Sequence, residues 1–354
     1  MKLSHLLTTV RTNFVQRATI GIFTCLSAIA CSTEPTPPTS SEQPASSTAS
    51  APKIVATFLP VHLFTKAVVG DTGEVDILIS PGAEVHDYQA TPEDAKLLAE
   101  ADILVENGLG MEEFLSDLVA NAGNSTLQQI DASEGIEAIK EKDDEHEGHD
   151  HEGHDHDEHG HEGHDHEGHD HDKQGHEGHG HHHAEGNPHV WLDPVLAQQQ
   201  VANIRDRLIE INPDNADDYR SNADAYVEQL QQLDNEFKEK LAPVQGCNFI
   251  TFHDAFPYLA QRYGLQQEAI VYIPEDSITP QDIQRVQQLA NEHQVKALLT
   301  EPGLKDKRIE QISSDLNVSL EALNPLESGE TDPQYYFQVM RGNLEALLRA
   351  CQST

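Results

Sequence analysis

A segment from Glu145 to Glu185 consists almost entirely of His, Asp, Glu and Gly, and it limits what the chain can fold into. Glycine and charged residues bury too little apolar surface to offset the loss of chain entropy, so this segment cannot join a packed core. Neutral imidazole is a common metal ligand, and the interleaved carboxylates attract cations. We therefore expect a disordered loop, bounded at 143–186, that collects metal ions. A solvated acidic spacer or an added tag is the alternative, although a tag would be a bare terminal His run.

All but six of the chain's 22 histidines lie in this segment and form the expected auxiliary metal loop: His146, His149, His151, His154, His156, His159, His161, His164, His166, His169, His171, His176, His179, His181, His182 and His183.

Residues 1–31 are predicted to direct export. An apolar run at 18–30 follows basic residues, and it is too short to span a bilayer comfortably. Small residues before Cys31 resemble a bacterial lipoprotein site, so this cysteine is the candidate for lipidation. Plain cleavage after Ala30 is the alternative, because lipoprotein sites usually carry Leu where Ala28 stands. Either way we expect the protein in the periplasm or on the outer face of the cytoplasmic membrane.

Residues 32–52 are rich in Ser, Thr, Pro and Ala and are predicted to be a flexible tether. The net charge of -39 argues against nucleic acid or an anionic membrane surface as a partner, and cations are its natural counterpart. Beyond the leader, the chain carries the single cysteine pair Cys247 and Cys351. In an exported protein this pair is expected to form a disulfide, with a reduced buried pair as the alternative.

The remaining sequence alternates between short apolar segments and helical segments, and the alternation occurs twice. Such a pattern implies parallel sheets with helices on both faces. We predict an α/β fold of two similar lobes, each a four-stranded parallel sheet flanked by helices, joined by a long rigid helix. The lobes are expected at 53–193, which includes the His-rich loop, and at 212–354, with the linking helix at 194–211. A cleft between two such lobes is the expected ligand site.

The expected strands are 54–58, 75–79, 103–105, 127–130, 248–252, 269–272, 295–299 and 319–323. The expected helices are 61–69, 92–100, 111–120, 194–211, 213–241, 254–263, 280–293, 306–316 and 333–349.

Three of the other histidines lie where ligands bind in open parallel sheets, beyond the carboxyl ends of strands. His86 follows the second expected strand, and His253 follows the first strand of the second lobe, which we take as the equivalent place. His189 lies between the His-rich loop and the linking helix. Three imidazoles and one further ligand suit tetrahedral zinc. His62 and His293 have no such placement and are interpreted as structural or solvated.

Four motifs connect these residues to a known family: Pro81 to Tyr88 with Pro92, Pro188 to Pro194, Phe252 to Phe256, and Thr300 to Pro302. Together they resemble the cluster A-I (cluster 9) metal-binding proteins of bacterial ABC importers. The resemblance implies two lobes with metal bound between them and delivered to a membrane permease, with its cytoplasmic ATPase as an indirect partner. It implies His86, His189 and His253 as ligands. The position of the His-rich loop is similar to that of the zinc-uptake branch, the substrate-binding proteins of high-affinity zinc uptake systems.

One departure leaves the fourth ligand open. The family often presents Asp-Pro-Leu in its last motif, whereas this chain has Asn324-Pro325-Leu326. Asparagine is a poorer ligand than a carboxylate, so water, Glu84, an imidazole of the His-rich loop or the oxygen of Asn324 are the alternatives, with water ranked first. A nitrogen-rich site without that carboxylate suits zinc better than manganese.

The leading functional interpretation is a non-enzymatic, monomeric binding protein without catalytic residues. It captures Zn²⁺ as its transported ligand for an ABC permease, with the His-rich loop as a low-affinity collector or sensor. One alternative is a periplasmic metal buffer or metallochaperone without a permease. The other is an exported zinc hydrolase, although the chain has no His-Glu-x-x-His pair and no Gly-x-Ser-x-Gly motif.

Overall fold

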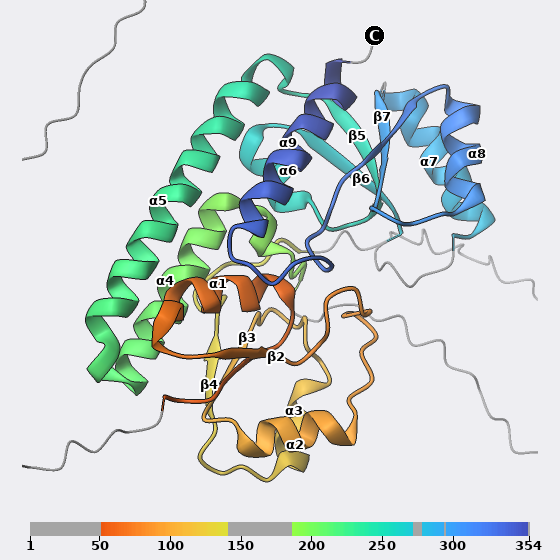
Figure 1. Ribbon diagram of the computed structural model, residues 1–354. Coiled ribbons are helices and arrows are strands. Elements are labelled where there is room, and N and C mark those ends of the chain that lie inside the picture. Colours follow the sequence, from red (N-terminus) through yellow and green to blue (C-terminus); the bar gives the residue numbers. More distant parts are fainter. Residues whose placement is uncertain (1–50, 141–185, 272–277, 294, 353–354) are drawn as a thin grey trace, which may run out of the picture. The chain divides into compact units, whose positions relative to one another are not determined.

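The computed structural model describes residues 51–140, 186–271, 278–293 and 295–352 (Figure 1). The expected export leader with Cys31, nearly all of the tether and the histidines of the auxiliary loop lie outside these residues. Within the described residues, no helix has the length and apolar character required to cross a membrane.

The first lobe is built on a sheet of four parallel strands in the order β2-β1-β3-β4. Its central strand β1 and the first three residues of β3 are buried and apolar, as expected for a parallel sheet covered on both faces. Helix α2 begins with a capping box between Thr91 and Asp94 and with Pro92 in its first turn, which satisfies free backbone amides there. The elements are β1 (Ile54–Ala56), α1 (Leu59–Val69), β2 (Val75–Ile77), α2 (Pro92–Glu100), β3 (Ile103–Glu106), α3 (Leu115–Ala122) and β4 (Gln128–Asp131).

The second lobe repeats this arrangement. Its sheet is also parallel, and its order β6-β5-β7-β8 matches that of the first sheet when β5 takes the place of β1. The prediction of two similar lobes with four-stranded parallel sheets is therefore confirmed. The elements are β5 (Asn248–His253), α6 (Pro257–Tyr263), β6 (Gln266–Val271), α7 (Pro280–His293), β7 (Ala297–Thr300), α8 (Lys307–Leu316), β8 (Ser319–Ala322) and α9 (Tyr335–Gln352).

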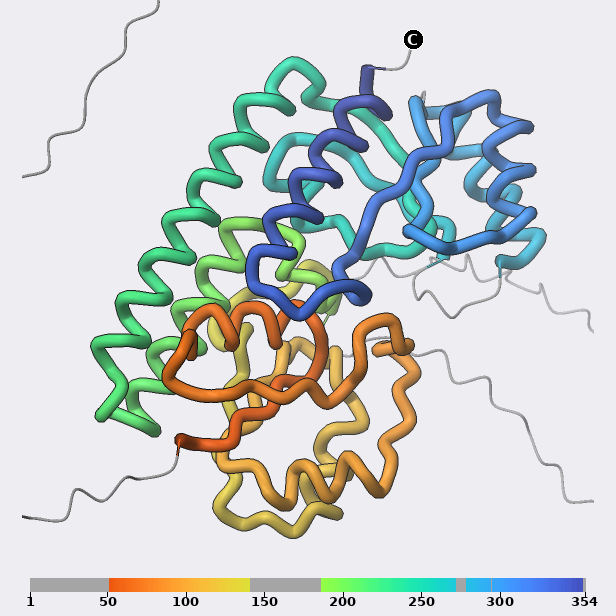
Figure 2. The backbone as a smooth tube through the Cα atoms, in the orientation of Figure 1, coloured from red at the N-terminus to blue at the C-terminus, as the bar shows by residue number. Residues whose placement is uncertain are grey.

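Two helices, α4 (Pro194–Ile211) and α5 (Ala216–Leu241), connect the sheets. Helix α4, the expected linking helix, packs on α1, β4 and α5. Helix α5 contacts α1 of the first lobe as well as α6 and α9 of the second. In Figure 2 it runs alongside both lobes. Because α5 contacts both lobes along its buried face, we assign the connection to α4 and α5 together.

A hydrophobic core continues from one lobe into the other. Trp191 is fully buried, and its ring packs edge-on against Phe58 with ring centroids 5.1 Å apart. Its indole Nε1 donates to the carbonyl oxygen of Pro325 at 2.8 Å, while the hydroxyl of Tyr336 donates to the Trp191 carbonyl oxygen at 2.8 Å. A single side chain thus joins the segment before α4 to the last loop of the second lobe, close to the predicted ligand His189.

The disulfide predicted between Cys247 and Cys351 is present, with the two Cα atoms 5.8 Å apart. It joins the residue before β5 to the last turn of α9. The bond therefore fastens the C-terminal helix to the amino end of a central strand, at the opposite end of that strand from His253.

Candidate metal centre

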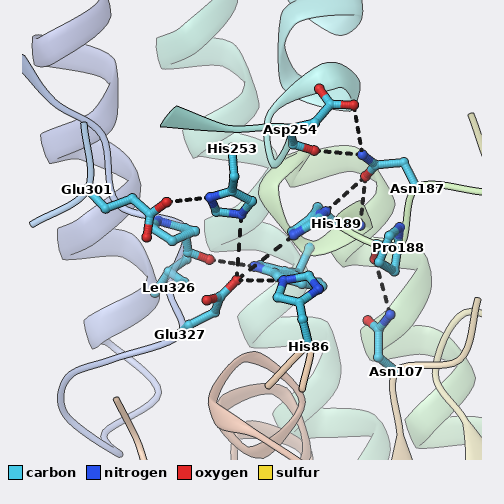
Figure 3. Close-up of polar contacts among 12 residues, drawn as sticks. His86, Asn107, Asn187, Pro188, His189, His253, Asp254, Glu301, Leu326 and Glu327 are labelled. Carbon is cyan, nitrogen blue, oxygen red and sulfur yellow. Dashed lines mark hydrogen bonds and ion pairs between the residues drawn. The ribbon is translucent and has the colours of Figure 1, made fainter. Parts of the chain in front are cut away.

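Four side chains from separate parts of the chain converge at one point: His86, His189, His253 and Glu327 (Figure 3). Each offers one ligand atom, and the four atoms all lie within 4.8 Å of one another. The structure therefore brings together the three histidines that the sequence singled out and adds a carboxylate.

The topology corrects one part of the sequence interpretation. His86 lies beyond the carboxyl end of β2, an edge strand, whereas His253 is the last residue of β5, an inner strand. Since β5 corresponds to β1 and not to β2, the two histidines do not occupy equivalent places. They still meet because each lies at the carboxyl end of a parallel strand, the edge where ligands bind in such sheets.

The spacing of the four side chains suits a shared ion better than mutual hydrogen bonds. Glu327 Oε1 lies 3.7 Å from His86 Nε2, 3.9 Å from His189 Nε2 and 4.0 Å from His253 Nε2. These distances exceed the usual 2.7–3.2 Å of a hydrogen bond. Ligand atoms around a tetrahedral zinc ion lie about 3.4 Å apart, because each bond is about 2.0–2.2 Å long. Small side-chain rotations would bring all four atoms onto one ion.

Second partners orient two of the rings. Asn187 Oδ1 accepts from His189 Nδ1 at 3.0 Å, and Glu301 contacts His253 Nδ1 in a short hydrogen bond. Occupying Nδ1 in this way leaves Nε2 as the nitrogen that faces the other side chains, the arrangement found around metal-bound histidines. The buried Nε2 of His253 has no hydrogen-bond partner among the described residues, so it is available to a ligand from outside the chain.

Charge within the group favours a cation. Burial opposes protonation of His253, but the charges and contact of Glu301, with help from Glu327, outweigh it and raise its pKa to about 9. Burial likewise opposes ionisation of Glu327, yet contact with His86 and the charges of His86 and His253 lower its pKa. Without metal, the site therefore holds a proton beside a carboxylate, and a dication can replace that proton.

Sequence reasoning did not identify Glu327. This residue lies in the loop between β8 and α9, one residue after the Asn324-Pro325-Leu326 motif. Two of the alternatives considered for the fourth position lie in other arrangements. Glu84 is exposed and does not belong to the group of four, and Oδ1 of Asn324 accepts a hydrogen bond from the backbone amide of Leu326. An acidic residue close behind the last family motif was the signal that could have indicated it.

The side chain of Asn324 forms a hydrogen bond within that loop. Its Oδ1 accepts from the Leu326 backbone amide at 2.8 Å, and its own backbone is held by the side chain of Asn343. Leu326 adopts a left-handed conformation with φ of 70°, which costs a non-glycine residue roughly 1–2 kcal/mol. The Asn324 side chain stabilises this turn, and the turn directs Glu327 toward the histidines.

The two histidines set aside by the sequence analysis lie elsewhere. His62 is buried within α1, and burial, together with nearby Lys66, lowers its pKa. His293 is the exposed last residue of α7. Neither belongs to the convergent group.

Comparisons with known proteins agree with this geometry. The family model described as ZnuA, zinc-uptake complex component A, periplasmic, matches residues 54–350. The chain is 34% identical over 299 residues to the high-affinity zinc uptake system protein ZnuA of Bacillus subtilis, covering 83% of this chain and 86% of that protein. It is also 34% identical to the zinc-binding lipoprotein AdcA of Streptococcus pneumoniae, but there it spans 54% of the relative's length.

The fold is similar to that of solved relatives as well. The crystal structure of Zn(II)-bound AdcA from Streptococcus pneumoniae superposes with a TM-score of 0.66 and 30% sequence identity, covering 85% of this chain and 58% of that one. The match over nearly the whole described region, together with the convergent histidines, shows that the chain belongs to the ZnuA family of zinc-uptake components.

Proposed function

We propose that this protein captures Zn²⁺ between its two lobes, through His86, His189, His253 and Glu327, and delivers it to an ABC permease. The observation that carries the proposal is the convergence of four donor atoms within 4.8 Å, contributed by both lobes and by the segment between them. The zinc uptake and zinc-binding functions named for the relatives support the same conclusion.

The chemistry of the four side chains favours zinc capture. Three imidazole nitrogens with one carboxylate oxygen form a donor set that zinc binds readily, whereas manganese prefers sites richer in oxygen. A catalytic zinc ion needs an open position for water or substrate, whereas here Glu327 would supply the fourth ligand of a bound zinc ion. Capture is therefore the better explanation than hydrolysis, and we infer that the protein is not an enzyme.

The export leader and the His-rich loop extend this proposal. AdcA of Streptococcus pneumoniae is named a lipoprotein, which supports our inference that Cys31 is lipidated and that the protein acts outside the cytoplasm. We also propose that it acts as a monomer. We propose that the loop at 143–186 binds zinc at lower affinity and gathers it near the lobes. Its interchangeable ligand sets offer little selectivity, so the tight site remains with the four convergent side chains.

Competition titration against a zinc chelator tests the capture site. The mature protein should hold one tight zinc ion, which His253→Ala should lose and a variant lacking 145–185 should keep. His293→Ala is the matched control, because it removes an exposed imidazole outside the site and should leave the affinity unchanged. Loss of the tight ion on deletion of 145–185, with full binding by His253→Ala, would overturn the proposal.

A growth experiment separates an importer from a metal buffer. A deletion strain should fail to grow in chelator-treated medium and should recover when zinc is added. A strain that keeps its zinc uptake unchanged in depleted medium would contradict the permease-linked function while leaving zinc binding intact.

A further inference from the structure

A small cavity lies beside the four convergent side chains, between the first and second lobes. Its volume is about 180 Å³, enough for several water molecules. The first lobe contributes Gly82, Ala83 and Glu84 to its wall, and the second contributes Glu301, Glu327 and Ser328. The backbone amide of Gly82 donates to the carbonyl oxygen of Glu327 at 2.9 Å, so the two walls are joined directly.

This cavity meets the metal centre on its carboxylate side. The side chains of His86, His189 and His253 are 1%, 2% and 1% exposed, whereas Glu327 is 15% and Glu301 is 20% exposed. Oε1 of Glu327, the atom nearest the three imidazoles, is itself buried. The exposed part of Glu327 therefore belongs to the rest of its side chain, which lines the cavity.

Glu301 takes part in both the metal centre and the cavity wall. Its carboxylate contacts Nδ1 of His253, and its side chain forms part of the cavity wall. The buried Nε2 of His253, which has no hydrogen-bond partner among the described residues, faces Oε1 of Glu327 at 4.0 Å. The carboxylates of Glu84, Glu301 and Glu327 therefore border the same cavity, and Glu327 also belongs to the group of four.

From this arrangement we propose that the metal ion enters and leaves the site through this cavity, with Glu84 and Glu301 attracting it before Glu327 and the imidazoles bind it. The inference rests on the proposed zinc capture and adds the route and the residues that set the binding rate. Among the described residues, three carboxylates and no cationic side chain line the cavity. A cavity lined by charges of one sign concentrates ions of the opposite sign and raises their association rate.

Blocking the cavity tests the route. Ser328 is exposed at the cavity wall, so Ser328→Trp should fill the opening without disturbing the core. An obstacle on the route raises the barrier in both directions equally. Stopped-flow binding and a chelator chase should therefore show zinc association and dissociation slowed together, by about tenfold or more, with the equilibrium affinity unchanged. Ser125→Trp, an exposed position in the turn before β4, is the control and should leave both rates as they are.

Removing one charge tests the attraction. Glu84→Gln should lower the association rate of zinc about two- to threefold at 0.15 M salt and more at low salt, because one exposed charge acts on a dication through screened water. Glu74→Gln makes the same charge change before the amino end of β2, away from the site, and should have no such effect.

The outcomes distinguish this inference from the proposed function. If Ser328→Trp and Glu84→Gln bind zinc tightly at unaltered rates, the ion uses another route and the inference fails while zinc capture stands. If the unaltered protein holds no tight zinc ion, the proposed function fails and the route has no meaning. If zinc association is slowed in Ser328→Trp and Glu84→Gln but not in the two control variants, the inference is supported.

Discussion

The protonation of His253 makes the zinc affinity depend on pH over an unusually alkaline range. Burial opposes its protonation, but Glu301 and Glu327 raise its pKa to about 9 in the metal-free protein. Metal binds only the neutral ring. At pH 7, two units below that pKa, about one molecule in a hundred has a neutral His253, which costs zinc binding roughly 3 kcal/mol. Affinity should therefore rise about ninefold from pH 7 to pH 8 and level off above pH 9.

Chelator-buffered zinc titrations between pH 6 and pH 10 measure this rise, and calorimetry in buffers of different ionisation enthalpy measures the proton released. Glu327, whose pKa is lowered, stays ionised over this range and so does not contribute to the pH dependence of the zinc affinity. Close to one proton should leave the site for each zinc ion bound at pH 7. Glu301→Gln removes the charge that contributes most to raising the His253 pKa, so its affinity should level off at a lower pH. A flat affinity between pH 7 and pH 9, with no proton release, would refute this reasoning.

Three further perturbations follow from the structure. Glu327→Gln keeps the shape of the side chain but removes its charge, and chelator competition should show zinc affinity lowered by about tenfold or more, since a neutral amide is a weaker ligand than a carboxylate. Asn187→Ala removes the acceptor that orients His189, and the same assay should show a loss of about 10–100-fold. Replacing Cys247 and Cys351 with serine opens a loop of 104 residues, so urea unfolding should show stability lower by about 4 kcal/mol. Zinc affinity should stay unchanged there, because the bond lies at the other end of β5 from the site; equal losses of stability and affinity would contradict that separation.

Local sequence patterns were sufficient for most elements of this fold. Strand β1 is apolar throughout and β3 is apolar up to Val105, while α2 begins after the N-cap Thr91 with Pro92. Both types of element are therefore recognisable from neighbouring residues alone. Several helices begin later than predicted: α3, α5 and α6 begin at Leu115, Ala216 and Pro257, not at 111, 213 and 254. Helix α3 begins at Leu115 because the chain before it turns through Gly108, Leu109 and Gly110, all with positive φ.

What sequence could not supply were the features that depend on strand order and loop conformation. The order β2-β1-β3-β4 is not visible in the chain, so His86 and His253 were assigned to equivalent strands although they are not. Glu327 was missed because its direction depends on the left-handed Leu326 and on the turn held by Asn324. A comparison of residue types at the fixed positions of a motif does not reveal a ligand that lies further along the loop, beyond the motif.

Anomalous diffraction at the zinc absorption edge, from crystals of the zinc-loaded protein, tests the central claim most directly. The account predicts one strong peak between the lobes, about 2.0–2.1 Å from Nε2 of His86, His189 and His253 and about 2.0–2.2 Å from a carboxylate oxygen of Glu327. A peak that lies elsewhere, or an ion whose fourth ligand is water or Asn324 with Glu327 turned away, would contradict it.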